Sequence, residues 1–150
     1  YKLPEAVLRH GEEVRLVQIN DELSQIKETE VSELVEIIKR EFEKGSVTCA
    51  LICKNKEKAK KAFARLSRYK DYLEKEIVDY SEDDYKTGLL ILPVEDAKGL
   101  EFDTVILLDV NKDTYPDTDL SARLFYVAIT RALHRLIIIE NENKSPLLKS

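Results

Sequence analysis

Four short apolar runs constrain the fold of this chain more strongly than any other feature of its sequence. They occupy residues 47–53, 88–94, 104–109 and 135–139, and they are apolar at nearly every position instead of alternating with polar residues. Strands of this composition are buried on both faces, which is typical of a parallel sheet covered by helices on each side. We therefore predict an α/β fold with a mainly parallel sheet and these four runs as its interior strands.

The segments between the runs predict the remaining elements. Apolar residues recur at helical spacing in residues 29–44, 55–66 and 121–132. Thr29 and Asn55 are placed to cap the first two helices, and Gly45 is placed to end the first. The lysines of the second helix predict a solvated face more than a patch that follows phosphates. The other predicted features are strands at 14–19 and 76–80, a polar turn at 81–86, a loop at 110–119 and a frayed tail at 141–150.

The composition is that of one folded domain. Of the 150 residues, 43% are hydrophobic and 35% are charged, which is typical of globular proteins. No apolar run approaches the roughly 20 residues that a membrane helix needs, and no signal peptide is visible. We expect a single domain over residues 1–150. Because the chain begins at Tyr1 and contains no methionine, we also expect it to be a fragment of a larger protein.

Charge and cysteine usage narrow the class further. The formal net charge of −5 argues against an autonomous nucleic-acid-binding module, which usually has a basic excess. Cys49 and Cys53 are four residues apart, so on one strand they lie about 13 Å from each other. That separation is too large for a disulfide. The pattern favours buried thiols and a cytoplasmic location.

Two segments carry residues that a generic core does not need. In the first, Lys98, Gly99 and Glu101 fall in a short connection between two apolar strands. Glycine permits a positive φ or the close approach of a ligand. We expect this connection at the carboxyl end of the preceding strand, where open α/β sheets bind ligands. A salt-bridged turn is the alternative interpretation.

The second segment is the predicted helix at 121–132, which ends in Arg131. Helical spacing returns Arg131 to the apolar face of that helix, so its guanidinium needs an anionic partner. The partner is either a carboxylate such as Asp109 or a phosphate, which suits the planar guanidinium equally well.

Several common sites are missing from the sequence. It has neither a GxxxxGK[ST] phosphate loop nor a GxGxxG motif. His10 and His134 have no neighbouring serine or cysteine arrangement typical of a hydrolase. The aspartates of the 110–119 loop lack the glycine and the final glutamate of a calcium loop, so we predict no metal site.

Two long motifs resemble a known family. Residues 97–109 (AKGLEFDTVILLD) resemble motif V of the superfamily 1A DNA helicases, the UvrD/Rep/PcrA-like family. Residues 124–138 (LFYVAITRALHRLII) resemble motif VI of the same family. Residues 9–14 followed by 49–55 resemble the part between motifs IV and V. The resemblance covers most of the chain and is strongest in its second half.

The resemblance implies a three-layer RecA-like domain, the second of two motor domains (2A). ATP and Mg²⁺ would bind between this domain and an N-terminal RecA-like domain of the same protein, which supplies the phosphate loop. By similarity, Arg131 would be the arginine finger at the γ-phosphate, and Glu101 would accept a hydrogen bond from the ribose. Gly99 and Lys98 would lie beside the phosphates.

Further roles follow from the same resemblance. Tyr126 and Thr130 would position the helix, and Thr130 would help couple the nucleotide state to the grip on DNA. Where the family has a Thr-x-His that contacts single-stranded DNA, this chain has Val94 and Glu95 after a proline.

The short distance from Cys53 to Gly88 leaves no space for the family's large 2B insertion and resembles the helicase IV/HelD-type branch. The expected function is an ATP-dependent DNA helicase or translocase that acts on single-stranded or duplex DNA. The alternative is an interaction module that acts on RNA polymerase.

Overall fold

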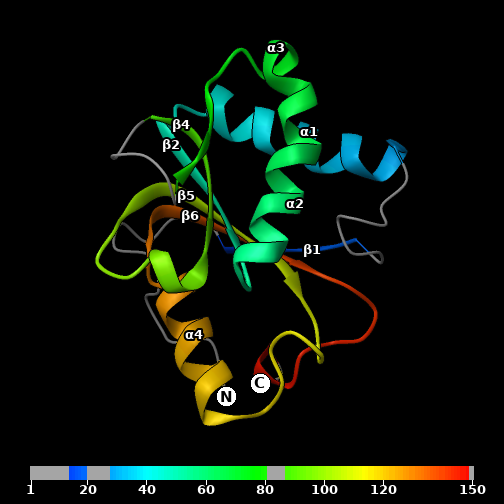
Figure 1. Cartoon of the computed structure of the whole chain (residues 1–150), viewed down its shortest axis with the longest axis vertical. Helices are drawn as coiled ribbons and strands as arrows, with labels where there is room; N and C mark the ends of the chain where they lie inside the picture. Colours follow the sequence, from blue (N-terminus) through cyan, green and yellow to red (C-terminus); the bar gives the residue numbers. More distant parts are fainter. Residues whose placement is uncertain (1–13, 20–27, 81–86, 149–150) are drawn as a thin grey trace.

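A six-stranded parallel sheet forms the centre of the computed structural model, which describes residues 14–19, 28–80 and 87–148 (Figure 1). The spatial order of the strands is β1-β6-β5-β2-β4-β3, and every neighbouring pair is parallel. The strands are β1 (Val14–Gln18), β2 (Thr48–Cys53), β3 (Ile77–Asp79), β4 (Gly88–Pro93), β5 (Phe102–Val110) and β6 (Ala132–Glu140). The predicted α/β class is confirmed.

The four apolar runs occupy the four interior positions of the sheet, as predicted. Alternate residues of these strands enter two separate apolar clusters. Leu51, Ile106 and Ile137 face one side, and their neighbours Ile52, Leu107 and Ile138 face the other. All six side chains are at most 1% exposed, so both faces of the sheet are buried.

Helices cover both faces and produce three layers. On one face lie α1 (Glu28–Glu43), α2 (Lys56–Leu66) and α3 (Lys70–Leu73). On the other face lies α4 (Asp119–Ile129), at the bottom of the view in Figure 1. Three short 3₁₀ helices complete the structure: η2 (Ser67–Tyr69), η4 (Val94–Asp96) and η5 (Pro146–Leu148). In the described ranges, no helix has the length and apolar character to cross a membrane.

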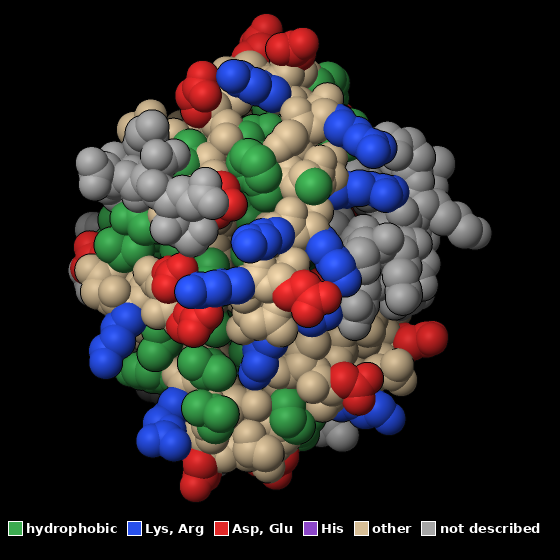
Figure 2. Space-filling view, in the orientation of Figure 1, with side chains coloured by type: hydrophobic (Ala, Val, Ile, Leu, Met, Phe, Trp, Pro, Cys, Tyr) green, Lys and Arg blue, Asp and Glu red, His purple; other side chains and the backbone are tan. Residues whose placement is uncertain are grey.

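Local capping signals explain where the first helices begin and end. The Asn55 side chain accepts a hydrogen bond from the Lys58 amide at 2.9 Å and caps α2, as predicted. Gly45 follows α1 with φ +105°, a conformation that glycine adopts without strain. Figure 2 shows Lys and Arg side chains over the middle of the face where α2 lies, with acidic side chains among them. This mixture is that of a solvated surface.

Several sequence predictions fall outside the described residues. They are the family-like positions 9–13, including His10, and the turn at 81–86. The predicted capping position of Thr29 is wrong, because α1 already begins at Glu28.

Several predicted boundaries are wrong, among them the starts of β5 and β6, which begin at Phe102 and Ala132 and not at residues 104 and 135. The helix predicted at 121–132 is α4, Asp119–Ile129, because the Thr118 side chain caps it by accepting from the Ser121 amide at 3.1 Å. Thr130 and Arg131 form a turn after α4, and Ala132 begins β6. Val94 leaves the predicted strand and begins η4.

The predicted frayed tail packs against the core in its described part. Ser145 is fully buried, and its hydroxyl donates a hydrogen bond to the carbonyl of Tyr115 at 2.6 Å. Leu147 is 1% exposed and joins the apolar cluster of α4. The prediction failed because two adjacent leucines, Leu147 and Leu148, among mostly polar residues give no periodic signal.

Candidate functional site

The two motif-bearing segments meet at the amino edge of the sheet, where its parallel strands begin. β4 ends at Pro93, which pairs with Cys53 at the carboxyl end of β2. β5 begins at Phe102, just before Thr104 pairs with Cys49 near the amino end of β2. Since β4 and β5 both run parallel to β2, the connection between them must return across the sheet. The expectation that this connection stays at the carboxyl end is therefore wrong for Glu101, which directly precedes β5.

A backbone hydrogen bond joins the two segments. The amide of Phe102 donates to the carbonyl of Arg131 at 2.9 Å. This contact places Arg131, which follows α4, beside the end of the 97–101 turn. Residues that are 29 positions apart in the sequence thus become neighbours at the edge of the sheet.

The Arg131 side chain folds back onto the end of α4. Its Nε donates to the carbonyl of Val127 at 3.0 Å, and its Nη2 donates to the hydroxyl of Thr130 at 2.9 Å. Both partners are neutral, and the side chain is half-buried. Asp109 is not the partner, because it lies seven residues along β5 from Phe102, about 23 Å toward the opposite edge. Within the described residues, Arg131 makes no ion pair.

The 97–101 turn presents its polar residues to solvent. Lys98, Gly99 and Glu101 are all exposed. Gly99 has φ +83°, and a Cβ built on it would meet no atom within 4 Å. The backbone at Gly99 is therefore open to an incoming ligand. Lys98 forms no ion pair within the described part of the chain, which leaves its ammonium available to solvent.

Thr130 and Tyr126 lie at the end of α4 but differ in exposure. The Thr130 hydroxyl donates to the carbonyl of Tyr126 at 2.8 Å and thereby caps the last turn. The Tyr126 side chain is 55% exposed on the outer surface of α4, beside an apolar groove. The contact between Tyr126 and Thr130 is thus made by the Tyr126 carbonyl, while its ring faces solvent.

Val94 and Glu95 lie earlier in the connection between β4 and β5, in a short helix that packs against α4. They belong to η4, which follows the carboxyl end of β4. Val94 is buried in the core, whereas Glu95 is exposed. The structure therefore brings the end of the 97–101 turn, at Glu101, beside Thr130 and Arg131. It places Val94 and Glu95 in η4, after the carboxyl end of β4.

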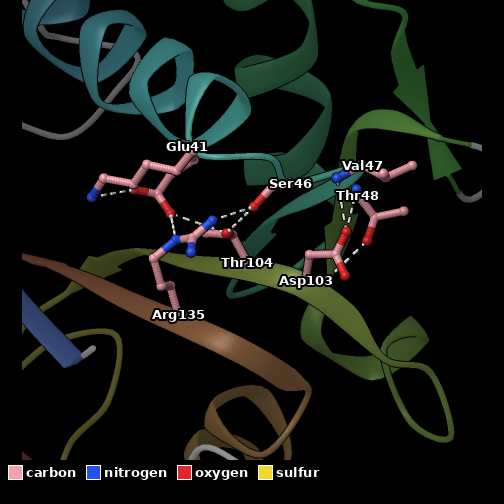
Figure 3. Close-up of polar contacts among 8 residues, drawn as sticks. Glu41, Ser46, Val47, Thr48, Asp103, Thr104 and Arg135 are labelled. Carbon is pink, nitrogen blue, oxygen red and sulfur yellow. Dashed lines mark hydrogen bonds and ion pairs between the residues drawn. The ribbon is translucent and has the colours of Figure 1, made fainter. Parts of the chain in front are cut away.

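A buried polar network behind the amino edge was missed from the sequence (Figure 3). Arg135 Nε lies 2.5 Å from Oε1 of Glu41, a carboxylate that is fully buried. The Thr104 hydroxyl donates to the same oxygen at 3.0 Å, and Arg135 Nη2 donates to the Ser46 hydroxyl at 2.8 Å. Two sequence signals were available: Glu41 falls on the apolar face of the predicted 29–44 helix, and Arg135 begins the apolar run at 135–139.

Asp103 ties the starts of β2 and β5 together in the same region (Figure 3). Its Oδ2 accepts hydrogen bonds from the amides of Val47 at 2.7 Å and Thr48 at 3.1 Å. The Asp103 amide donates in return to the Thr48 hydroxyl at 2.9 Å. Asp103 is two residues beyond Glu101, so these bonds anchor the end of the turn.

Both cysteines are buried in β2, as predicted, and neither forms a disulfide. Burial raises the pKa of the Cys49 and Cys53 thiols well above their usual range. In the described part of the chain, no group of three His, Cys, Asp or Glu side chains is arranged to hold a metal ion.

Comparison with known proteins identifies the family. The model of the UvrD-like helicase C-terminal domain matches residues 9–143, nine-tenths of the chain. The chain belongs to this family. The search of curated proteins finds no match.

A solved structure supports the fold of this UvrD-like domain. The C-terminal domain of a possible DNA helicase from Lactobacillus plantarum WCFS1 matches with a TM-score of 0.71 and 23% identity. The match covers 95% of this chain and 83% of the other. At that identity the likeness concerns the fold, and it agrees with the RecA-like architecture expected from the motifs.

Proposed function

We propose that this chain is the second motor domain of an ATP-dependent DNA helicase or translocase. It would supply Arg131 and Glu101 to an ATP molecule held by a separate N-terminal RecA-like domain. The observation that carries the proposal is the Phe102–Arg131 hydrogen bond, which unites motif V and motif VI at one edge of the sheet. Membership of the UvrD-like family supports it.

The hydrogen-bond partners of Arg131 are consistent with a side chain that binds an anion when one is present. A carbonyl and a hydroxyl satisfy two of its donors but leave its charge uncompensated. A phosphate offers both charge and paired acceptors, so it competes well for the planar guanidinium. Exchange of the Thr130 hydroxyl for a phosphate oxygen would free Arg131 from α4.

The other residues at this edge fit the rest of a nucleotide. The open, positive-φ backbone at Gly99 permits close approach of a phosphate, and Lys98 adds a mobile positive charge. Glu101 would accept a hydrogen bond from a ribose hydroxyl. ATP, with the Mg²⁺ held by the first motor domain, would supply the free energy of phosphoryl transfer. Arg131 would stabilise the charge that develops on the γ-phosphate oxygens.

The proposal also assigns roles to the rest of the protein. Its sequence contains no phosphate loop, so hydrolysis depends on the first motor domain. The DNA would pass the carboxyl edge near Val94 and Glu95, where the family has its Thr-x-His. We also propose the helicase IV/HelD-type branch, because α2, η2, α3 and β3 occupy the short interval between β2 and β4.

A second function is favoured by the acidic character of η4. Glu95 is exposed and Asp96 is half-buried, and neither carboxylate attracts a DNA phosphate. These residues suit a helicase-like interaction module that acts on RNA polymerase without unwinding DNA.

ATP turnover measured with and without single-stranded DNA separates the two functions. In a protein that carries both motor domains, the motor proposal expects DNA-stimulated turnover and strand displacement. The module proposal expects neither and instead expects binding to purified RNA polymerase. Residues 1–150 alone should neither hydrolyse ATP nor bind an oligonucleotide tightly. Steady turnover by this chain that disappears in Arg131→Ala would contradict the motor proposal.

A further inference from the structure

The apolar residues of β5 and β6 leave their mutual register poorly specified. β6 contains Ile137, Ile138 and Ile139 in succession, and β5 opposes them with Ile106 and Leu107. A slip of one residue exchanges the two faces of a strand. In a run of identical isoleucines, the slipped strand would bury almost the same side chains. Hydrophobic packing alone therefore discriminates weakly between the two registers.

The register nevertheless changes at a defined place beside Arg131. Phe102 pairs with Ala132 and Thr104 pairs with Arg135, so two steps along β5 match three along β6. The irregularity also changes the facing of β5. Phe102 packs with the cluster of α4, whereas the Thr104 side chain contacts Glu41 of α1 on the opposite face. Such irregularities re-aim the chain where they occur.

Arg135 is the residue that distinguishes the registers. In the observed register it lies opposite Thr104 and reaches Glu41 and Ser46. A one-residue slip would direct its guanidinium into the apolar cluster of α4, far from any of these partners. Burying an unpaired charge is very unfavourable. The observed pairing is therefore the one that satisfies Arg135.

We propose that Arg135, together with Glu41, is a positioning residue that fixes the β5–β6 register and so holds Arg131 beside the 97–101 turn. A buried ion pair adds little net stability compared with well-packed apolar residues. Its value here is the selection of one register. The inference rests on the proposed function, because it concerns the delivery of Arg131 to a nucleotide.

The test replaces both charges at once, in the double variant Glu41→Leu with Arg135→Met. Loss of Arg135 alone would remove the shorter of the two ion pairs of the buried Glu41 carboxylate, leaving Lys44 at 3.4 Å and the Thr104 hydroxyl, and would destabilise the chain. The matched control is Glu57→Leu with Lys61→Met, which removes an exposed ion pair of 3.2 Å on α2. Both double variants remove one positive and one negative charge.

Two measurements are made on each variant. Amide hydrogen exchange on residues 1–150 reports the Phe102 amide, which donates to Arg131. ATP turnover in the protein with both motor domains reports kcat and KM. We expect the melting temperature to be unchanged or higher, Phe102 exchange to be at least tenfold faster, and kcat to fall about 10- to 100-fold with KM unchanged. The control should match the wild type in all three.

The outcomes separate this inference from the proposed function. Unchanged Phe102 exchange overturns the register role. Unchanged kcat in the Glu41/Arg135 variant also overturns the inference if Arg131→Ala lowers turnover in the same protein. If Arg131→Ala has no effect, the proposed finger role fails, and Phe102 exchange alone decides whether Arg135 sets the register. Should the double variant not fold, Arg135→Lys decides by the same measurements, because it keeps the charge but loses the two-pronged contact.

Discussion

The amino and carboxyl edges of the sheet differ in the exposure and packing of their side chains. At the amino edge, the exposed 97–101 turn and the half-buried Arg131 lie on the surface, above a buried network of charged and hydroxyl groups. At the carboxyl edge, the chain closes over itself. Tyr115 is fully buried there, its carbonyl accepts a hydrogen bond from Ser145, and Lys54 Nζ lies 4.4 Å from its ring centroid. One edge offers polar groups to a ligand, and the other is packed.

The proposed site at the amino edge would reverse the usual arrangement of open α/β sheets, in which ligands bind at the carboxyl edge. A domain with no phosphate loop does not need that edge for a nucleotide. If it faces a neighbour whose own carboxyl edge holds ATP, its amino edge is the one that completes the site. Variants at the two edges test whether the amino edge serves activity and the carboxyl edge serves stability.

The largest expected effect is the loss of turnover in Arg131→Ala. Because an arginine finger contributes about 10³–10⁵ in kcat, turnover by the protein with both motor domains should fall by that factor. The melting temperature should change little, since the side chain bonds only to Val127 and Thr130 among the described residues. Steady-state kinetics and thermal unfolding on the same sample provide both readouts.

Arg131→Lys is the control for charge. A point charge does not reproduce the planar donor arrangement, so little activity should return. A variant that melts early but turns over normally per folded molecule would assign Arg131 to stability and would remove the contrast between the edges.

Tyr115→Ala should produce the opposite result. Removing a fully buried aromatic ring should cost about 3–5 kcal/mol of unfolding free energy. Its ring also makes an edge-to-face contact with Phe125, with centroids 5.8 Å apart. Denaturant unfolding measures the loss, and turnover per folded molecule should stay near that of the wild type.

Tyr115→Phe is the matched control for the hydroxyl. This hydroxyl is buried and has no hydrogen-bond partner within the described residues. Its removal should therefore leave stability unchanged or raise it by up to about 1 kcal/mol. A clear loss of stability in Tyr115→Phe would mean that the carboxyl edge holds a polar contact important for folding.

Alkaline pH should destabilise the domain through its two buried thiols. Burial raises the pKa of Cys49 and Cys53, so each stays protonated in the folded chain above the pH at which it ionises in the unfolded chain. Their contribution is complete below about pH 8.5 and is lost as the pH rises. Between about pH 9 and 10, stability should fall by about 1.4 kcal/mol per pH unit for each thiol.

Single cysteine variants sharpen this comparison along one strand. Cys49 lies in the amino half of β2 and Cys53 at its carboxyl end. Cys49→Ala and Cys53→Ala should each remove half of the alkaline slope in urea unfolding measured at several pH values. A slope that one variant abolishes completely would mean that the other thiol is accessible to water.

The smallest expected effect belongs to Glu101→Ala. A ribose contact is much the same in the ground and transition states, so its loss should raise KM about tenfold and leave kcat nearly unchanged. Steady-state ATP kinetics measure both constants. A fall in kcat with constant KM would assign Glu101 to the chemical step and place it with Arg131.

Local sequence signals were sufficient for most of the secondary structure. The uninterrupted apolar runs predicted the interior strands because burial on both faces leaves no alternation. Asn55 and Gly45 marked helix ends through bonds and conformations within a few residues of themselves. The end of α4 was misplaced because the Phe102–Arg131 bond, a contact between distant segments, draws the following residues into β6.

The candidate site, like the fold, was predictable only in part from the sequence. The amino-acid sequence by itself determined that this is an α/β chain with two chemistry-bearing segments, since residue type and periodicity are local properties. Only the tertiary structure decided that both segments meet at the amino edge, that Asp109 lies too far from Arg131, and that Arg135 reaches Glu41. These outcomes depend on the order and direction of the strands: β4 and β5 lie on either side of β2 and both run parallel to it, so the 94–101 connection must return across the sheet. No pattern within a short stretch of sequence encodes that order, because it arises from pairing between strands that are far apart along the chain.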